Sequence, residues 1–354
     1  MKTLFNTILI LFLSPIVWAN GIEFQRHVKQ KSVKKAYIVN SDAGIDINNS
    51  YGNVYVTTWA EDKIELDILI KVSSDNEDWA TKKLNDIDID IEALKSLVTA
   101  KTVFSNGAGN TNTKNSSIEV NYTIKIPKNG SVKIYNKYGD IITTDLFSTV
   151  DVKCKYGKIT LGKLSGNDNK LDIEYCSKSS VDYVKAATIS ADYSGLTMND
   201  FGNVTLKADY TDIHFKEGNN LKFDCNYGKL VSGKLNNLEG SGDYLTININ
   251  EISNNLKVNT KYSKLTVDTV NSSAGNISVV SGYTTVGIGY SPAYAFDFDI
   301  KLKYANLKYP NDLEVSSKQE TNFTKSYEGY NKKTGVNKVT IVSDYGNVNL
   351  NKKL

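Results

Sequence analysis

A tyrosine recurs every 17 to 19 residues through the middle of this 354-residue chain. Tyr283 and Tyr304 extend the series at intervals of 21 residues, and Tyr51 and Tyr345 carry the same flanking pattern near the two ends. The regular series is Tyr138, Tyr156, Tyr175, Tyr193, Tyr210, Tyr227, Tyr244 and Tyr262. This repeat constrains the fold most, because so short a unit cannot bury its own apolar face and must stack on its neighbours.

Apolar residues stand at fixed distances on both sides of the repeat tyrosine. They occur six and four residues before it, as Val150 and Val152 do, and three and five residues after it. Spacing by two is the alternation of a β-strand, and its phase changes at the Tyr-Gly step, where a glycine such as Gly157 fits a bend. Asparagine tolerates left-handed backbone, so the asparagines seven residues before the tyrosine predict a second corner. These are Asn203, Asn220, Asn237, Asn255 and Asn276.

Each unit is therefore predicted to be a strand, a bend, a second strand and a turn. The predicted fold class is all-β: a single-stranded parallel β-solenoid with coils of about 18 residues, in which the tyrosines form a column along one corner. A left-handed β-helix needs a six-residue period, which apolar anchors at −6, −4, 0, +3, +5 and +8 do not show. A β-propeller needs units of about 40 residues. Because parallel crossovers are nearly always right-handed, we expect a right-handed β-helix.

The domain organisation predicted is a signal peptide over 1–19 and one β-solenoid domain over 20–354. Lys2 precedes an apolar run, and Val17 and Ala19 are the small residues of a cleavage site. A small β/α insertion interrupts the repeat over about 60–117, with a helix expected after the capping residues Ser74 and Glu77. A polar excursion over about 311–338 precedes the last coil. Both segments are candidates to cover the open ends of the stack.

Charge and hydropathy narrow the location and the partners. The 42 Lys and Arg against 39 Asp and Glu leave no basic stripe, so we expect no nucleic-acid partner. No stretch after residue 19 is apolar enough to cross a bilayer, so no membrane span is expected in the mature chain. The protein is expected to be exported across the inner membrane, to the periplasm, the cell surface or the medium.

No set of residues in the sequence predicts a catalytic, cofactor-binding or metal-binding site. Lyases built on β-helices use a basic residue with acidic calcium ligands, but the single arginine, Arg26, precedes the repeat. Glycosidases need two carboxylates that flank the bond, and no Asp-Asp pair occurs in this chain. The only histidines are His27 and His214, and strand parity places His214 on the outside.

The cysteines are Cys154, Cys176 and Cys225, an odd number without a C-x-x-C motif. Cys154 and Cys225 occupy the same coil position four coils apart, about 19 Å, whereas a disulfide needs Cα atoms within about 7 Å. Cys176 has the opposite parity, just after its tyrosine. We therefore expect all three thiols to be unpaired.

The residues directly before the tyrosine form a column that is largely acidic. Like charges about 5 Å apart repel, and a cation such as calcium could neutralise them. Neutralisation by lysines of the same face, such as Lys207, is the interpretation we favour. The column comprises Glu174, Asp192, Asp209, Asn226 and Asp243. We likewise expect Asp88, Asp90 and Glu92 to form a solvated strand face.

The stretch VNYTIKIPKNGSVKIYNKYGDIITTDL (120–146) resembles a bacterial family of unknown function catalogued as putative adhesins. NNSYGNVYVTTW (48–59) is similar to the opening coil of that family. The resemblance covers most of the mature chain. It implies a β-helical fold and an envelope or surface location, and it carries over no catalytic or ligand residues. The shared features are Tyr122, Ile124, Ile126, Pro127, Val132, Ile134, Gly139, Asp140 and Ile141.

Taken together, these patterns predict an exported, non-catalytic protein that binds a glycan or a cell-envelope protein. Two alternatives stay open. One is a carbohydrate-active enzyme, a polysaccharide lyase or hydrolase built on a β-helix. The other is a periplasmic partner in envelope maintenance or signalling.

Overall fold

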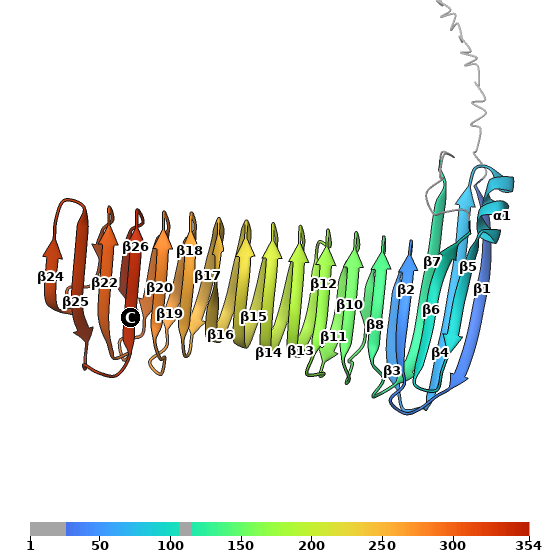
Figure 1. The fold of residues 1–354 in the computed structure, drawn as a ribbon, viewed down its shortest axis with the longest axis horizontal. Coiled ribbons are helices and arrows are strands. Elements are labelled where there is room, and N and C mark those ends of the chain that lie inside the picture. The colour runs from blue at the N-terminus through green and yellow to red at the C-terminus, as the bar shows by residue number, and fades with distance from the viewer. Residues whose placement is uncertain (1–25, 106–114, 354) are drawn as a thin grey trace, which may run out of the picture.

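Parallel pairing between repeat units dominates the computed structural model, which describes residues 26–105 and 115–353. The fold is nearly all-β: within these ranges 27 strands belong to one large sheet, and one helix accompanies them. Figure 1 shows an elongated stack whose strands run across its long axis. The predicted signal peptide lies outside the described residues.

Two rows of strands run along the stack, because strands before the tyrosine pair with one another and strands after it do the same. In spatial order, the first row consists of β5 (Ile87–Ala93), β6 (Leu97–Phe104), β2 (Gly44–Ser50), β8 (Val132–Lys137), β10 (Val150–Lys155), β12 (Asn169–Glu174), the second halves of β13 (Ser179–Asp192), β14 (Gly195–Asp209), β15 (Asp212–Asn226) and β16 (Gly228–Asp243), then β18 (Leu256–Lys261), β20 (Ile277–Gly282), β26 (Lys338–Asp344), β22 (Phe296–Lys303), β25 (Thr324–Asn331) and β24 (Glu314–Glu320).

The second row consists, in spatial order, of β1 (His27–Ile38), β4 (Lys63–Ser74), β7 (Ser117–Pro127), β3 (Val54–Trp59), β9 (Ile141–Thr143), β11 (Ile159–Leu164), the first halves of β13 to β16, β17 (Leu245–Ile252), β19 (Lys264–Val270), β21 (Thr285–Tyr290), β27 (Val348–Lys352) and β23 (Leu307–Lys308). Neighbouring repeat units pair in parallel, for example Val204 with Leu221. This arrangement is compatible with the solenoid that the repeat predicts.

The core lies between the two rows and follows the predicted alternation. In the unit of Tyr156, Val150, Val152 and Cys154 before the tyrosine and Ile159 and Leu161 after it are all buried. Burying each such side chain contributes about 1.5–3 kcal/mol, and like positions stack on one another along the chain. The apolar periodicity therefore predicted these core positions correctly.

The tyrosine itself is not a core anchor, and that part of the prediction is wrong. Eleven of the repeat tyrosines keep 42 to 52% of their surface exposed. All twelve have φ between 50° and 64°, so the chain reverses at the tyrosine through the left-handed region and leaves its ring outside the core.

The asparagines of the second corner also differ from the prediction. Among the described residues, none of the five has a positive φ. Their side chains instead form a ladder, in which Nδ2 of Asn220 donates to Oδ1 of Asn203 at 2.7 Å and Nδ2 of Asn237 donates to Oδ1 of Asn220 at 2.7 Å. Amide pairing between coils, not backbone tolerance, explains their recurrence.

The glycine after several of the tyrosines allows close approach between coils. A Cβ atom on Gly139 would lie 1.9 Å from the carbonyl oxygen of Gly52, and one on Gly157 would lie 2.1 Å from the carbonyl oxygen of Gly139. Neither glycine has a positive φ. The bend predicted at this glycine is therefore made by the tyrosine, while the glycine sets the spacing of the coils.

The N-terminal end of the stack is extended by the predicted insertion. β6 pairs beyond β2, and β7 pairs beyond β3. Helix α1 (Glu77–Asn85) packs against β1 and β4. Its cap is Asn76, whose Oδ1 accepts a hydrogen bond from the Trp79 N–H at 2.9 Å. The prediction of Ser74 as the cap is wrong, because Ser74 Oγ accepts from the Asn76 N–H one step earlier.

At the other end, the last coil in sequence is not the last in space. β26 pairs between β20 and β22, and β27 pairs between β21 and β23. The chain thus builds the coil of Tyr304, forms the β24–β25 hairpin against β22, and returns to fill the place between Tyr283 and Tyr304. The expectation that Tyr304 follows Tyr283 directly is wrong, and the polar excursion over 311–338 contains the hairpin of this end.

Close approach at the glycine can be tested with a matched pair of substitutions. Gly139→Ala is expected to lower the free energy of unfolding by about 2–3 kcal/mol, because its Cβ meets backbone of the adjacent coil. Gly195→Ala, where the nearest atom would be 3.5 Å away, should change it by no more than about 0.5 kcal/mol. Urea unfolding measures both. Equal losses would show that the Gly139 contact does not set the coil spacing.

Candidate binding surface

The repeat tyrosines form one continuous stack, which we call the tyrosine ladder. Neighbouring ring centroids lie 4.7 to 5.2 Å apart, and the ring planes differ by 2° to 23°. The ladder follows the edge of the stack at which strands β8, β10 and β12 end, at the top of Figure 1. Its spatial order is Tyr51, Tyr138, Tyr156, Tyr175, Tyr193, Tyr210, Tyr227, Tyr244, Tyr262, Tyr283, Tyr345 and Tyr304.

Stacking offsets the backbone cost of this position. The left-handed conformation costs a residue other than glycine roughly 1–2 kcal/mol, and asparagine or glycine would tolerate it better. A stacked aromatic pair contributes about 0.5–1.5 kcal/mol, and an unbroken ladder supplies about one pair per tyrosine. Stacking on the neighbouring rings therefore stabilises tyrosine at this position, and the loss of one ring within the ladder removes two stacking contacts.

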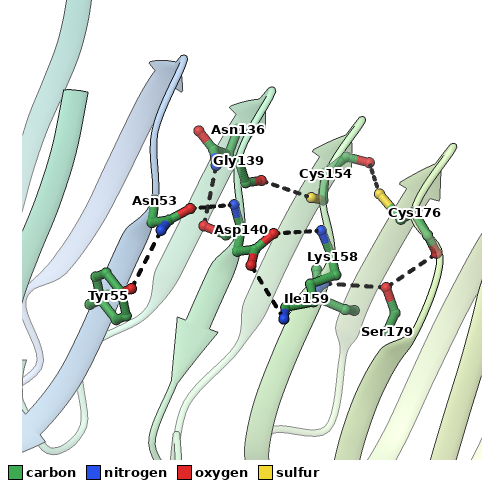
Figure 2. A network of polar contacts seen from close by, with 10 residues as sticks. All are labelled: Asn53, Tyr55, Asn136, Gly139, Asp140, Cys154, Lys158, Ile159, Cys176 and Ser179. Carbon is green, nitrogen blue, oxygen red and sulfur yellow. Dashed lines mark hydrogen bonds and ion pairs between the residues drawn. The ribbon is translucent and has the colours of Figure 1, made fainter. Parts of the chain in front are cut away.

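Polar side chains under the ladder satisfy the backbone of the corner in two alternative ways. Where serine or threonine follows the tyrosine, its hydroxyl donates to the carbonyl before the tyrosine, as Ser194 does to Asp192 at 2.7 Å. At two of the corners where glycine follows, a side chain two residues before the tyrosine donates instead: Asn49 Nδ2 to the Gly52 carbonyl at 3.4 Å and Ser343 Oγ to the Gly346 carbonyl at 2.7 Å. Asn136, also two residues before its tyrosine, donates to the carbonyl one residue further on, that of Asp140, at 3.3 Å (Figure 2).

Cys154 and Cys176 occupy these corner positions in adjacent coils. The Cys176 thiol donates to the carbonyl oxygen of Cys154 at 3.1 Å, and the Cys154 thiol lies 3.6 Å from that of Gly139 (Figure 2). All three cysteines are free, as predicted, and buried. The parity argument for Cys176 is wrong, however, because the corner turns its side chain inward. The neighbouring Cys154 thiol lowers the pKa of Cys176 to about 7, whereas burial raises the pKa of Cys225 to about 12.

A phenylalanine closes each end of the ladder. The Phe104 ring, at the end of β6, meets Tyr51 edge-on at 5.8 Å. The Phe323 ring, in the turn between β24 and β25, lies 5.3 Å from Tyr304 at a tilt of 53°. The two segments that interrupt the repeat thus each supply an aromatic ring to an end of the same surface.

The ladder presents ring edges and hydroxyl groups to solvent, because stacking covers the ring faces. From Tyr156 to Tyr262, no ladder hydroxyl makes a hydrogen bond with another group of the described chain. Near one end, Lys137 Nζ lies 4.8 Å from the centroid of Tyr138 and 5.8 Å from that of Tyr156. Lys303 Nζ lies 5.9 Å from the centroid of Tyr304 near the other end.

The acidic column beside the ladder is held by hydrogen bonds. Asn226 Nδ2 donates to Oδ1 of Asp209 at 3.0 Å, and Asn226 Oδ1 accepts from the Asp243 N–H at 3.0 Å. Lys155 pairs with Glu174, whereas the expected neutralising residue, Lys207, forms no ion pair in the described part of the chain. Burial, together with the charge of Asp209, raises the pKa of Asp192. The described residues contain no group of three His, Cys, Asp or Glu placed to hold a metal ion.

The other residues singled out in the sequence do not come together. Arg26 donates to Ser117 Oγ at 3.1 Å, and His27 Nδ1 lies 3.7 Å from a carboxylate oxygen of Glu77, both at the N-terminal end. His214 is exposed in β15, as predicted. On β5, Asp88, Asp90 and Glu92 are exposed, and Asp88 lies 3.3 Å from Lys31 Nζ.

Hollows of about 350 to 440 Å³ lie on the outer surface. One is lined by outward strand residues that include Thr205 and Lys222, next to the asparagine ladder. The core between the two rows is filled by side chains of the repeat. No helix in the part of the chain that the structure describes has the length and hydrophobicity needed to span a bilayer.

Sequence reasoning missed the exposure of the ladder and both of its caps. Strand parity did not indicate the exposure, since each tyrosine is in phase with the buried positions six, four and two residues before it, as Val150, Val152 and Cys154 are for Tyr156. Phe104 and Phe323 lie in segments without the repeat, so nothing in the periodicity assigns them to the ladder. Their place follows only from the way the two ends fold over the stack.

Comparison with known proteins gives a weak likeness. The chain is similar to a putative cell adhesion protein from Clostridium sporogenes (14% identity, 91% of this chain and 100% of that chain covered, TM-score 0.17). It is also similar to putative adhesins from Bacteroides fragilis (14%, 91% and 97%, 0.26) and Parabacteroides distasonis (11%, 91% and 97%, 0.35). With TM-scores this low, the likeness carries no argument. No protein-family model and no curated protein matches the chain.

The balance between stacking and backbone strain can be tested at Tyr210. Tyr210→Ala is expected to lower the free energy of unfolding by about 2 kcal/mol, because two stacking contacts are lost and the strain remains. Tyr210→Gly should cost about 1 kcal/mol less, because glycine adopts the left-handed conformation freely. His214→Ala, as a control, should change it by no more than about 0.5 kcal/mol. A glycine variant that is no more stable than the alanine variant would contradict the claim that residue 210 adopts a strained left-handed conformation.

The acidic column predicts a pH-dependent effect at Asn226. Asn226→Asp places a third carboxylate between Asp209 and Asp243 and is expected to destabilise the fold by about 1 kcal/mol at pH 7. In the variant, repulsion raises the folded-state pKa of the introduced carboxyl, so its contribution to stability is present below the unfolded pKa and is lost as the pH rises through the folded value. Melting curves should therefore show little effect at pH 3. Asn259→Asp, an exposed position in β18, is the control; a loss that does not depend on pH would contradict the account.

Proposed function

We propose that this chain is an exported, non-catalytic binding protein, built as a right-handed β-solenoid, that holds a long partner along the tyrosine ladder. The observation that carries this proposal is the size of the exposed aromatic surface. Eleven tyrosines that are each about half exposed present on the order of 1,000 Å² of ring edges and hydroxyl groups. The largest apolar patch on a typical monomer is about 300–600 Å², and larger patches mark interaction sites. The apolar segment at residues 1–19 supports export, and with it a place at the cell envelope or surface.

The shape of the ladder favours an extended partner. It is one ring wide and roughly 50 Å long at the strand spacing of about 4.8 Å. A globular ligand could touch only a few of its steps, whereas a long partner meets every step in the same geometry. Many weak, equivalent contacts then add up to useful affinity, as they do on other repeat proteins.

The scatter of reactive groups supports a non-catalytic role. Arg26 and His27 lie at the N-terminal end, while His214 stands alone on β15. The thiols are buried in the core and its corner. General acid–base or nucleophilic catalysis needs two or more such groups within hydrogen-bond reach of one substrate atom, and His214 in β15 lies far along the stack from Arg26 and His27.

Binding to arrays of glycans and envelope proteins tests the proposal. The double variant Tyr210→Asn/Tyr227→Asn keeps a side chain that tolerates the left-handed turn but removes two central rings. It is expected to weaken partner binding at least tenfold. Tyr55→Asn, which removes an exposed tyrosine of β3 outside the ladder, is the control and should bind normally.

Turnover is assayed on the same polysaccharides. Cleavage that survives repeated purification would overturn the non-catalytic assignment in favour of a carbohydrate-active enzyme. Equal binding by the double variant and the wild type would show that the ladder is not the binding surface.

A further inference from the structure

We propose that the long partner of the tyrosine ladder is a second copy of this chain, bound side by side and antiparallel. The inference rests on the proposed function, namely that the ladder is the binding surface. It commits that surface to one occupant, and the area, the spacing, the flanking charges and the shape of the ends all bear on the choice.

The exposed area suits a dimer. A stable protein interface of standard size takes about 800 Å² from each partner, close to the roughly 1,000 Å² of aromatic surface along the ladder. Neighbouring planes in the central ladder differ by only 2° to 3°, from Tyr193 to Tyr210 and on to Tyr244, so the surface is straight over these steps. A straight surface can remain in contact with its own copy over many steps.

The chemistry of the ladder is self-complementary. Each exposed hydroxyl can donate one hydrogen bond and accept others, and the hydroxyls from Tyr156 to Tyr262 have no partner within the described chain. A second ladder offers the same groups at the same spacing of 4.7 to 5.1 Å in this region. A sugar chain, which usually stacks on an exposed ring face, would find these faces already covered by neighbouring rings.

The charges directly before the tyrosines favour the antiparallel direction. A two-fold axis between Tyr210 and Tyr227 places the column of one copy beside the same column of the other, in reversed order. Lys137 then lies opposite Asp344 of the second copy, because their tyrosines are second from either end of the ladder. Glu174 lies opposite Lys261 by the same count. Symmetry produces each of these opposite-charge pairs twice.

The residues two positions after the tyrosines add a central pair. Asp212 and Lys229 follow the two middle tyrosines, are exposed, and lie 3.7 Å apart within one chain. Across the same axis each of them faces its opposite in the second copy. One like-charge pair, Asp192 with Asp243, opposes the arrangement.

A parallel dimer is disfavoured on two grounds. It places the residue before each tyrosine against the residue two positions after the same tyrosine in the other copy. Only Lys137 and Asp140 would then form an opposite-charge pair. The like-charge pairs would be Lys155 with Lys158, Asp209 with Asp212, and Lys261 with Lys264. In addition, β7 and α1 project past the line of the turns at the N-terminal end (Figure 1), so in a parallel dimer these segments of the two copies would face each other.

The experiment combines sedimentation equilibrium with zero-length cross-linking of lysine to carboxylate. A mixture of ¹⁴N- and ¹⁵N-labelled full chains, as recovered from cells, is cross-linked with a carbodiimide and mapped by mass spectrometry. Within one chain Lys137 and Asp344 are nine coils apart, roughly 43 Å, and Glu174 and Lys261 are five coils apart, roughly 24 Å. Cross-links between these residues therefore arise only between copies. We expect a dimer at micromolar concentration with both cross-links carrying mixed isotopes.

A charge swap provides the matched control. Lys229→Asp is expected to raise the dissociation constant of the dimer at least tenfold. The new aspartate of each copy would face Asp212 of the other copy, so two like-charge pairs would form at the centre of the interface. Asp212→Lys/Lys229→Asp restores both the pair within the chain and the pair between chains, and should return the constant to within about twofold of wild type. Melting curves verify that both variants remain folded. A swap that fails to restore the dimer would overturn the antiparallel register.

The outcomes separate this inference from the proposed function. A monomer at about 100 μM whose binding to glycans or envelope proteins is lost in Tyr210→Asn/Tyr227→Asn overturns the second copy as the occupant and leaves the ladder as a binding surface. A dimer that lacks both cross-links and is unaffected by that double variant overturns the inference. If, in addition, the double variant binds glycans and envelope proteins as well as the wild type does, the proposed function is overturned too.

Discussion

The ring of each repeat tyrosine lies on the ring of the adjacent coil, and the rest of the structure depends on this contact. The same residue reverses the chain through the left-handed region, at a cost that stacking has to offset. The coils must therefore lie at one ring spacing, which is also the spacing of hydrogen-bonded strands. Gly139 and Gly157 permit that approach, and the polar corner beneath satisfies the carbonyl groups that the turn leaves unpaired.

The two ends of the stack are closed by different strand arrangements, but each places a phenylalanine against the last tyrosine of the ladder. At the N-terminal end, strands from the insertion extend both rows. At the other end, the chain first builds the coil of Tyr304 and the hairpin that pairs with it. It then returns to insert β26 between β20 and β22. Each end adds a phenylalanine to the ladder. The outermost strands at the N-terminal end carry charge: lysines in β1, and Asp88, Asp90 and Glu92 in β5. Charged edges resist end-to-end pairing of two stacks.

The repeat period predicted much of this arrangement from the sequence, because strand alternation fixes which residues of each unit face inward. Val150, Val152, Ile159 and Leu161 are buried for that reason. Periodicity could not show that the tyrosine adopts a positive φ. The tyrosine recurs at the same position of the repeat unit whether its ring is buried or exposed. Nor could periodicity place Tyr345 between Tyr283 and Tyr304, because a stack of equivalent units accepts a coil in either order. The candidate surface was therefore recognised as a column, but its exposure and its ends were not.

The ladder unites the architecture and the proposed binding role, since one residue type supplies the turn, the contact between coils and the exposed surface. A crystal structure of the full chain tests this claim most directly. The account predicts ladder tyrosines with φ near 50° to 64°, ring centroids 4.7 to 5.2 Å apart, and Tyr345 between Tyr283 and Tyr304. Tyrosines with negative φ whose rings are buried in the core, or Tyr304 stacked directly on Tyr283, would contradict it.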